Sequence, residues 1–492
     1  MELQFVSKPI HCLGRVVWDV QEFEQTQEVR LPEDMPDIGS VVCAWGQCVL
    51  RGKEWHADKV GVSGGVMAWV LYIPADGSQP RTVEAWLSMQ GKWPMPECRN
   101  EGSIRTHWLL SGVDGRMLSA RKILVRASAQ VLTEAYAPKE AEVYTPVQTP
   151  ADVQVLTNSY PVLMPKEAGE KSFLVQEDVQ LPEMEAVVSL QLTPQVREQA
   201  VVGGKAVFRG DAGLHLVYKG QDGMIHSLDR EVPFSQFSDL DRDYDKEAAL
   251  CVVPAVSNLE TEQTQDGLQI KASLVMQYLV MDREMVEVAE DAYSPLRSVI
   301  CHQQETALPM ELDRRQERME LQVEFAARPG QMADVSVFPR HCGVHKAGQI
   351  HELENCGSVQ MLWYDAGGEL HADTEKYAAI LEMPGQAMVV GRVLGLESPQ
   401  ISAMGDRVEV HMALNLEAVT DAEAPMAVLS GLELGEVCKP DPARPSLILR
   451  RAEQESLWEL AKGCGSTMDA IRSANGLEGE PQMGQMLLIP VS

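Results

Sequence analysis

The sequence predicts a mainly β protein, in which tandem antiparallel β-rich domains precede a small α+β module with the order strand, helix, helix, strand. Three observations support this class. Apolar strand patterns that lead into tight turns recur at a constant spacing, and other stretches alternate polar and apolar residues. The last residues, 447–492, change to helical periodicity after a proline-rich stretch. We therefore expect β domains in the body of the chain and a separate module at its end.

An apolar strand followed by a turn occurs three times. Its tyrosines are Tyr72, Tyr218 and Tyr364, and both intervals equal 146 residues (218 − 72 and 364 − 218). A spacing of this length suits tandem domains rather than a solenoid. Tight hairpin turns need positive φ, which glycine adopts readily, so each strand is expected to enter a hairpin. The predicted turns are Asp76-Gly77, Asp222-Gly223 and Gly367-Gly368.

A polar–apolar period of two marks further strands. Residues 123–131, 268–274 and 407–417 alternate in this way. Such strands have one buried and one wet face, as in an antiparallel sheet. Proline-rich stretches between the patterns predict the boundaries. The predicted domains are 1–146, 147–298 and 299–438, followed by a proline-rich linker at 439–446 and the module at 447–492.

Acidic residues dominate the charge of the chain. Lys and Arg number 42 and Asp and Glu 72, which gives a formal net charge of −30, while 45% of the residues are apolar. The apolar fraction is sufficient for sizeable cores and argues against wholesale disorder. A surface this negative repels phosphate backbones, so no nucleic-acid partner is expected. It favours solubility or docking to a basic protein surface.

The sequence also bears on location. Residues 1–18 contain scattered charges and no continuous apolar segment of the kind found in export signals. The longest apolar stretches, such as 66–73, fall far below the roughly 20 residues that span a bilayer. The ten cysteines show no paired framework, as is typical of reduced thiols. We expect a cytoplasmic protein without direct membrane insertion, and we predict no oligomeric state.

Motifs for catalysis are not recognisable. The chain lacks a phosphate-binding Gly-x-x-x-x-Gly-Lys-Ser/Thr loop, a Gly-x-Ser-x-Gly elbow and a His-Glu-x-x-His pair. One stretch superficially resembles a zinc site, but zinc needs four converging ligands and these residues read as ordinary strand positions. They are His341, Cys342, His345, His351 and Cys356. We expect no enzymatic activity, no metal and no cofactor.

Tryptophan is concentrated in the first predicted domain, at positions 18, 45, 55, 69, 86, 93 and 108. Most of these side chains are expected in the core, because aromatic residues dominate β-sandwich interiors. The alternative is an exposed aromatic interaction patch that contains Trp45, Trp55 and Trp93.

Four elements of the body carry a family resemblance. They are the Leu-Pro-Glu-Asp-x-Pro-Asp-Ile stretch at 31–38, the Leu-Tyr hairpin, the Val-Pro-Phe-Ser-Gln-Phe segment at 232–237 and the Ala-Tyr-Ser-Pro ending at 292–295. Together they resemble the SPOCS domain of sporulation and coat-associated proteins from spore-forming Firmicutes. The resemblance implies SPOCS-like β domains along the body, of which the third, at 311–434, is the most divergent.

The C-terminal residues carry a second resemblance. Residues 449–462 fit a strand, a turn and a first helix, residues 465–477 a second helix ending in Ala-Asn-Gly-Leu, and residues 484–490 a closing strand. This order and these endings resemble a LysM module. Thr467 is a plausible start and Asn475-Gly476 a plausible end of the second helix.

SPOCS-like domains followed by a LysM-like module are the layout of a spore coat protein family. The resemblance implies a non-enzymatic scaffold that assembles or tethers the spore coat in the mother cell, at the forespore surface. It also implies that the module binds a coat morphogenetic ATPase rather than peptidoglycan. The alternative is a cell-wall protein that binds peptidoglycan or N-acetylglucosamine polymers.

In LysM modules the ligand groove lies between the first turn and the loop before the last strand. At the first turn Gln454-Glu455 replaces the usual Gly-Asp, and the lost glycine argues against close approach of a glycan. Trp458 is the natural anchor if it is exposed, but we expect it to be partly buried against the second helix. The resemblance places the partner- or glycan-binding groove at Gln454, Glu455, Ser456, Leu457, Trp458, Ile471, Asn475, Gly479, Glu480, Pro481 and Gln482.

Overall fold

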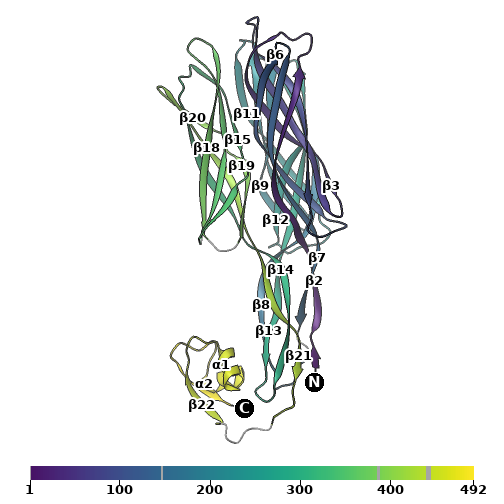
Figure 1. The fold of residues 1–492 in the computed structure, drawn as a ribbon, viewed down its shortest axis with the longest axis vertical. Helices are drawn as coiled ribbons and strands as arrows, with labels where there is room; N and C mark the ends of the chain where they lie inside the picture. Colours follow the sequence, from purple (N-terminus) through teal and green to yellow (C-terminus); the bar gives the residue numbers. More distant parts are fainter. Residues whose placement is uncertain (1, 146–147, 349, 385–387, 439–444, 492) are drawn as a thin grey trace.

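A computed structural model describes residues 2–145, 148–348, 350–384, 388–438 and 445–491. Its long antiparallel strands confirm the predicted mainly β class, and its last elements have the predicted order strand, helix, helix, strand. Figure 1 shows an elongated body of strands with the small module beside its narrow end. Within the described residues, the strands of the body form three β units.

The first β unit, β2 to β7, packs a sheet of order β2-β7-β6 beside one of order β3-β4-β5. In β5 buried and exposed residues alternate along most of the strand, as a sheet with one apolar face requires. The bounds are β2 (Val6–Arg30), β3 (Ile38–Trp55), β4 (Lys59–Pro74), β5 (Arg81–Pro94), β6 (Ser103–Ser119) and β7 (Lys122–Thr145).

The middle β unit, β8 to β13, repeats this strand order with the sheets β8-β13-β12 and β9-β10-β11. Its first and last strands along the chain, β8 and β13, pair over nearly their whole length. The bounds are β8 (Gln154–Gln180), β9 (Met184–Val201), β10 (Lys205–Gly220), β11 (Ile225–Asp239), β12 (Ala249–Thr264) and β13 (Gly267–Tyr293).

The third β unit, β14 to β21, has shorter strands where the other units have continuous ones. β17 pairs with β15, β16 and β18, while β21 pairs with β14, β19, β20 and the N-terminal β1 (Glu2–Gln4). The bounds are β14 (Val299–Phe325), β15 (Gln331–Pro339), β16 (Gly343–Ala347), β17 (Ile350–Tyr364), β18 (Leu370–Pro384), β19 (Met388–Leu396), β20 (Gln400–Met404) and β21 (Arg407–Leu434).

Three long ribbons, β2–β7, β8–β13 and β14–β21, extend from the units into the narrow end of the body (Figure 1). Apolar side chains from all three meet there, among them Ile10, Val162 and Val428. Burial of these side chains holds the ribbons together, because each ribbon alone would leave its apolar face in water.

Positive-φ glycines close the predicted hairpins. Gly77 (φ 72°), Gly223 (φ 80°) and Gly368 (φ 84°) lie in the turns that follow β4, β10 and β17. A side chain is strained in this conformation, so the glycines at these positions explain why the sequence pattern predicted the turns correctly.

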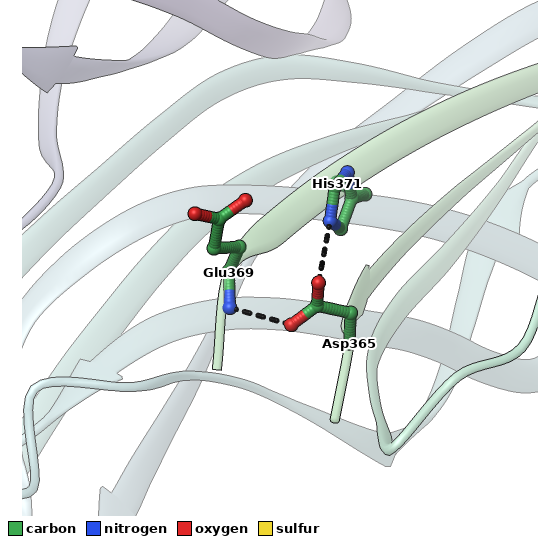
Figure 2. A group of neighbouring side chains, drawn as sticks. All are labelled: Asp365, Glu369 and His371. Atoms are coloured by element: carbon green, nitrogen blue, oxygen red, sulfur yellow. Dashed lines mark hydrogen bonds and ion pairs between the residues drawn. The ribbon is translucent and has the colours of Figure 1, made fainter. Parts of the chain in front are cut away.

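The turn after β17 is further stabilised by an aspartate (Figure 2). Asp365 Oδ1 accepts hydrogen bonds from the backbone amides of Gly367 at 2.8 Å and Glu369 at 2.9 Å. Its other oxygen lies 3.4 Å from Nε2 of His371, whose ring stacks on Trp363 with centroids 4.7 Å apart. The backbone hydrogen bonds and His371 hold the pKa of Asp365 below its usual range, so the carboxylate stays charged.

The three units share one core. A continuous apolar cluster contains Trp45 and Leu71 of the first unit, Phe208 of the middle unit and Leu362 of the third. Trp45 is fully buried, as is Trp93 in a neighbouring cluster. The alternative of an exposed aromatic patch is therefore wrong for these two tryptophans. The shared core means that no unit can be removed without exposing apolar surface on the others.

Equivalent segments of the units also enclose a cavity of about 510 Å³. Gly46, Leu192 and Phe338, which line it, are spaced by 146 residues each (192 − 46 and 338 − 192). Two side-chain-to-backbone hydrogen bonds link such segments directly: the Gln191 side chain donates to the Gly46 carbonyl at 2.9 Å, and the Leu192 amide donates to the Gln47 side chain at 2.7 Å. The 146-residue interval thus corresponds to positions that meet in space.

A buried carboxylate joins all three units near this cavity. Asp334 of the third unit accepts hydrogen bonds from Trp45 Nε1 of the first at 2.8 Å and from His215 Nε2 of the middle unit at 2.7 Å. His215 Nδ1 lies 2.7 Å from Asp229. Although burial opposes a charged imidazole, Asp334 and Asp229 outweigh it and raise the pKa of His215 to about 10. His215 is therefore a cation at neutral pH.

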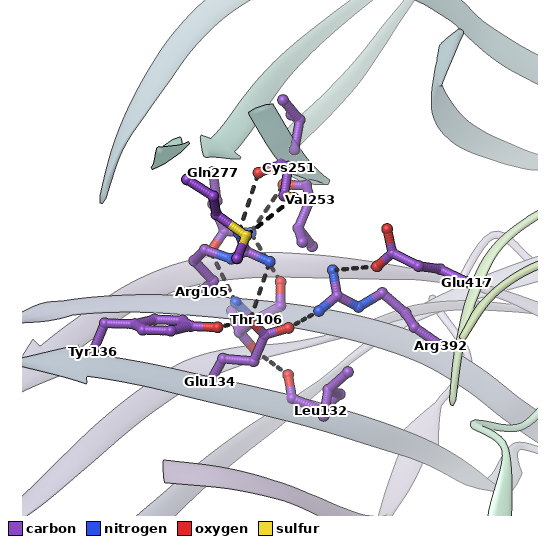
Figure 3. Close-up of polar contacts among 12 residues, drawn as sticks. Arg105, Thr106, Leu132, Glu134, Tyr136, Cys251, Val253, Gln277, Arg392 and Glu417 are labelled. Carbon is purple, nitrogen blue, oxygen red and sulfur yellow. Dashed lines mark hydrogen bonds and ion pairs between the residues drawn. The ribbon is translucent and has the colours of Figure 1, made fainter. Parts of the chain in front are cut away.

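A second buried network crosses the units (Figure 3). Arg392 of the third unit lies between Glu134 of the first unit and Glu417 of its own unit, 3.6 Å away. Arg105 of the first unit pairs with Glu134 at 3.0 Å and donates to the Cys251 carbonyl of the middle unit at 3.1 Å. Burial lowers the pKa of Arg392 to about 10, so it remains charged at neutral pH. The two arginines of this network thus face two glutamates across the contacts between the units.

We predict that stability falls as the pH rises from 6.5 to 10, because the raised pKa of His215 makes the folded state bind a proton that the unfolded state releases in this range. Urea unfolding at pH 6, 8 and 9.5 should show this loss in the natural chain and a flatter profile in His215→Gln. His345→Gln, which removes an exposed histidine paired with Glu354, should keep the natural slope. Identical slopes for His215→Gln and the natural chain would contradict this assignment.

We also predict a large effect from Arg392→Met, which removes the buried cation that lies between the carboxylates of Glu134 and Glu417. Its free energy of unfolding should fall by about 3–5 kcal/mol. Adding Glu417→Gln should recover part of this loss, because it removes the buried charge that Arg392 faces in its own unit, while Glu134 keeps its pair with Arg105. Arg318→Met, which breaks an exposed pair with Glu397, is the control and should change the free energy of unfolding far less than Arg392→Met does. If the changes in the free energy of unfolding from the two network substitutions simply add, the network is contradicted.

Candidate partner-binding module

The C-terminal module forms from local signals that agree with its tertiary structure. The strand β22 (Leu447–Arg451) pairs with β23 (Met486–Pro490), and between them lie α1 (Leu457–Cys464) and α2 (Met468–Asn475). Thr467 caps α2 by accepting the Ala470 amide, and Gly476 ends it with φ 63°. Both predicted ends of the second helix are therefore confirmed.

The start of α1 carries a cap that the sequence analysis missed. Ser456 accepts the backbone amide of Glu459 at 3.2 Å, and the Glu459 carboxylate accepts the Ser456 amide at 2.8 Å. This reciprocal pair is a capping box, whose signature Ser-x-x-Glu is legible in the sequence. It fixes where α1 begins and so positions the first turn of the predicted groove.

The two loops predicted to flank the groove do meet. The amide of Leu457 donates to the Glu480 carboxylate at 2.7 Å, which ties the first turn to the loop before β23. Glu455 pairs with Arg450 of β22 at 2.7 Å. The remaining polar residues of these loops are at least partly exposed: Gln454, Ser456, Gly479, Glu480, Pro481 and Gln482.

The apolar residues of the predicted groove lie in the core of the module. Leu457 and Ile471 are fully buried in the module core, so neither presents a surface to a ligand. Asn475 donates to the carbonyls of Ile471 and Leu488 and accepts the Leu488 amide, which joins α2 to β23. These three residues hold the module together. Helical spacing alone could not separate them from groove residues, because a core face and a binding face share one periodicity.

Trp458 is buried in a cluster that contains Ile471 of α2 and also reaches the body of the chain. Only 6% of it is exposed, and its ring meets Tyr293 of β13 edge to face, with centroids 4.8 Å apart. We expected it to pack on the second helix. The helix α1 also presents Trp458 to the end of the β8–β13 ribbon, a contact that we did not expect between residues 165 positions apart in the chain (458 − 293).

Asp291 is the polar centre of this contact. It accepts Trp458 Nε1–H at 2.8 Å and lies 2.6 Å from Nζ of Lys462. Burial alone would raise the pKa of Asp291, but the hydrogen bonds from Lys462 and Trp458 outweigh it and lower the pKa. The carboxylate is therefore charged at neutral pH. The Tyr293 hydroxyl adds a hydrogen bond to the Ser466 carbonyl at 3.0 Å.

An apolar strip on the outer face of the module sheet was not predicted. Leu447 and Leu449 on β22 and Met486 on β23 are 49%, 66% and 53% exposed. The inner face of the same sheet, with Leu487 and Ile489, lies in the module core. The alternation of β22 shows which residues share a face, but only the packed helices decide which face is covered.

The zinc-like residues do not converge on one point. His345 faces Glu354 at 3.2 Å, whereas the ring of His341 lies 5.3 Å from that of His107. The backbone amide of His341 donates to Gln130 of the first unit. These residues are part of the strands β15 to β17 or their connections.

The side chains in Figure 2 are a separate group that offers ligand atoms within 4.8 Å of one another in the described part of the chain. The middle unit also has an aspartate–histidine pair at its hairpin turn, where Asp222 accepts the Met224 amide and lies 3.0 Å from His226. Counted from the turn glycines Gly223 and Gly368, Met224 stands where the third unit has Glu369. Because the aspartate–histidine pair recurs without the third ligand, turn stabilisation accounts for it, and we assign no metal to it.

The comparisons with known proteins identify the middle of the body. The family model described as SipL, SPOCS domain matches residues 183–264. The matched residues comprise β9 to β12, including the hairpin and the 232–237 segment that carried the sequence resemblance. Neither the curated proteins nor the solved structures yielded a match. Within the described residues, no helix is long and apolar enough to cross a membrane.

The match to a SPOCS domain indicates a spore-associated role, related to sporulation or the spore coat. The family match and the mainly β structure agree with the resemblance carried by the sequence. The chain therefore contains, at residues 183–264, a segment similar to the SPOCS domain of the SipL family.

Proposed function

We propose that the protein is a non-enzymatic scaffold of spore coat assembly that binds a coat morphogenetic ATPase through its LysM-like module. It acts in the mother-cell cytoplasm, at the forespore surface. The SPOCS match supports the coat-related role. The observation that carries the choice of a protein partner is the exposed apolar strip of Leu447, Leu449 and Met486.

The strip has the chemistry of a protein contact. Aliphatic and thioether side chains gain free energy when a partner removes them from water, and methionine adapts its shape to the partner surface. A sugar polymer instead needs hydrogen-bonding groups arranged along its hydroxyls. Exposed apolar side chains that lie together on a surface indicate a protein-binding site more strongly than scattered ones do.

The groove offers less to a glycan. Its apolar members Leu457 and Ile471 are in the core, and Trp458 is covered by Tyr293. The Leu457 amide, which opens the first turn, already donates to Glu480. A glycan in the groove would have to displace that carboxylate and would find no exposed aromatic ring among the groove residues. The wall-binding alternative is therefore disfavoured.

The charge distribution supports docking of the body to a basic surface. The module contains four basic and six acidic residues, so its formal charge is −2 (4 − 6). The rest of the chain therefore carries −28 (−30 + 2). Such a body is drawn to positively charged proteins and repelled by anionic polymers. It suits a scaffold that adds further contacts around the module.

Leu449→Glu in the full chain should lower capture of the purified ATPase at least about tenfold, because a charge in the strip would be desolvated at the interface. Leu174→Glu on β8 is the matched control, since that leucine is 61% exposed but lies in the body. Binding is measured by surface plasmon resonance on chains whose fold is checked by circular dichroism. The proposal fails if folded Leu449→Glu captures the ATPase as well as the control does. It also fails if the natural chain sediments with peptidoglycan and does not bind the ATPase.

A further inference from the structure

We propose that the end of the β8–β13 ribbon is a docking site for the chain's own C-terminal module. This contact, here called the latch, leaves the apolar strip facing outward and buries Trp458 so that no partner can reach it. The latch consists of Asp291 and Tyr293 on the ribbon and of Trp458, Lys462 and Ser466 on the module. The outward role of the strip rests on the function proposed above. The latch itself does not depend on any partner.

The ribbon is shaped for this contact by an irregularity near its end. The pairing of β13 with β8 shifts between Ala289 and Asp291, so Glu290 is an extra residue, as in a β-bulge. Bulges re-aim the side chains next to them. Glu290 is held by hydrogen bonds from Asn158 and Tyr160 of β8, while Asp291 meets the module. A local feature of the middle unit thus serves a contact outside that unit.

The chemistry of the contact is specific on both sides. The Trp458 indole and the Lys462 ammonium converge on one carboxylate, and the Tyr293 ring covers the edge of the indole. The Tyr293 hydroxyl donates to the Ser466 carbonyl, a group in the buried connection between α1 and α2. Aromatic side chains with a bonded polar group and a charge-assisted hydrogen bond are the features of a recognition surface rather than of incidental contact.

The latch is modest enough to be reversible. Lys462 and Asp291 are both partly exposed, so salt screens their attraction. In the sequence, the twelve positions 435–446 separate β21 from β22, so the module is covalently tethered to the body (446 − 434). A short tether of this kind gives effective concentrations on the order of millimolar, at which weak contacts are well populated. The closed state therefore needs no larger interface.

When the module is docked, one of its faces contacts the ribbon and the opposite face stays exposed. The helices lie on the inner face of the β22–β23 sheet, and α1 faces the ribbon through Trp458. Leu447 and Leu449 lie on the opposite face of that sheet and remain exposed. Trp458 is thus a positioning residue, which orients the module on the body, while the strip is left for a partner.

The test is charge reversal in the full chain. Asp291→Lys places two ammonium groups together and should open the latch, whereas Glu287→Lys makes the same charge change at an exposed position on the same strand. Hydrogen–deuterium exchange is followed at residues 456–467 and 291–296, and the radius of gyration by small-angle scattering. We expect at least about fivefold faster exchange and a larger radius for Asp291→Lys, with no change for the control. Unchanged exchange and radius in folded Asp291→Lys would overturn the latch.

Compensation and binding complete the test. Lys462→Asp added to Asp291→Lys should restore part of the protection, because it rebuilds an opposite-charge pair. Absence of any recovery would overturn the pairing. ATPase capture should stay within about twofold of the natural chain in Asp291→Lys, while Leu449→Glu should lose capture yet keep its protection. Loss of capture in the opened variant would overturn the assignment of Trp458 as a positioning residue, without affecting the evidence for the latch.

Discussion

Buried charges at the contacts between the β units are the constraint on which the rest of the structure depends. Arg392 needs Glu134 of another unit, and Asp334 needs His215 and Trp45 from the other two. An ionised group that loses such a partner inside the protein costs several kcal/mol, far more than a surface pair contributes. The continuous apolar core acts in the same direction. We therefore expect the units to unfold together rather than as independent domains.

This mutual dependence extends to the narrow end of the body. The ribbons pack on one another through an apolar cluster that includes Val162 and Val428, so the end of β13 has a defined place relative to the units. The module meets that end through Asp291 and Tyr293. The long strands thus connect the buried charge network of the units to the contact that orients the module. In the function proposed above, this packing would fix where the partner is held.

The candidate site shows where a motif stops being informative. The LysM-like pattern located the loops that Glu480 joins to Leu457, and it placed both ends of α2 correctly. It also placed Leu457 and Ile471 in a groove, although both are core residues. An amphipathic helix has one apolar face, and the sequence does not state whether a ligand or the rest of the fold covers it. The strip of β22 and β23 was missed for the same reason, since alternation defines faces but not their neighbours.

The sequence by itself determined what depends on residues close together in the chain. Positive φ at Gly77, Gly223 and Gly368 set the hairpins, and Thr467 and Gly476 set the second helix, because steric limits and capping act within a few residues. The period of two determined the strands in the same way. Only the tertiary structure decided that Trp458 meets Tyr293 and that Asp334 joins three units. Those contacts link residues more than a hundred positions apart, so they depend on how whole sheets pack, which no local pattern records.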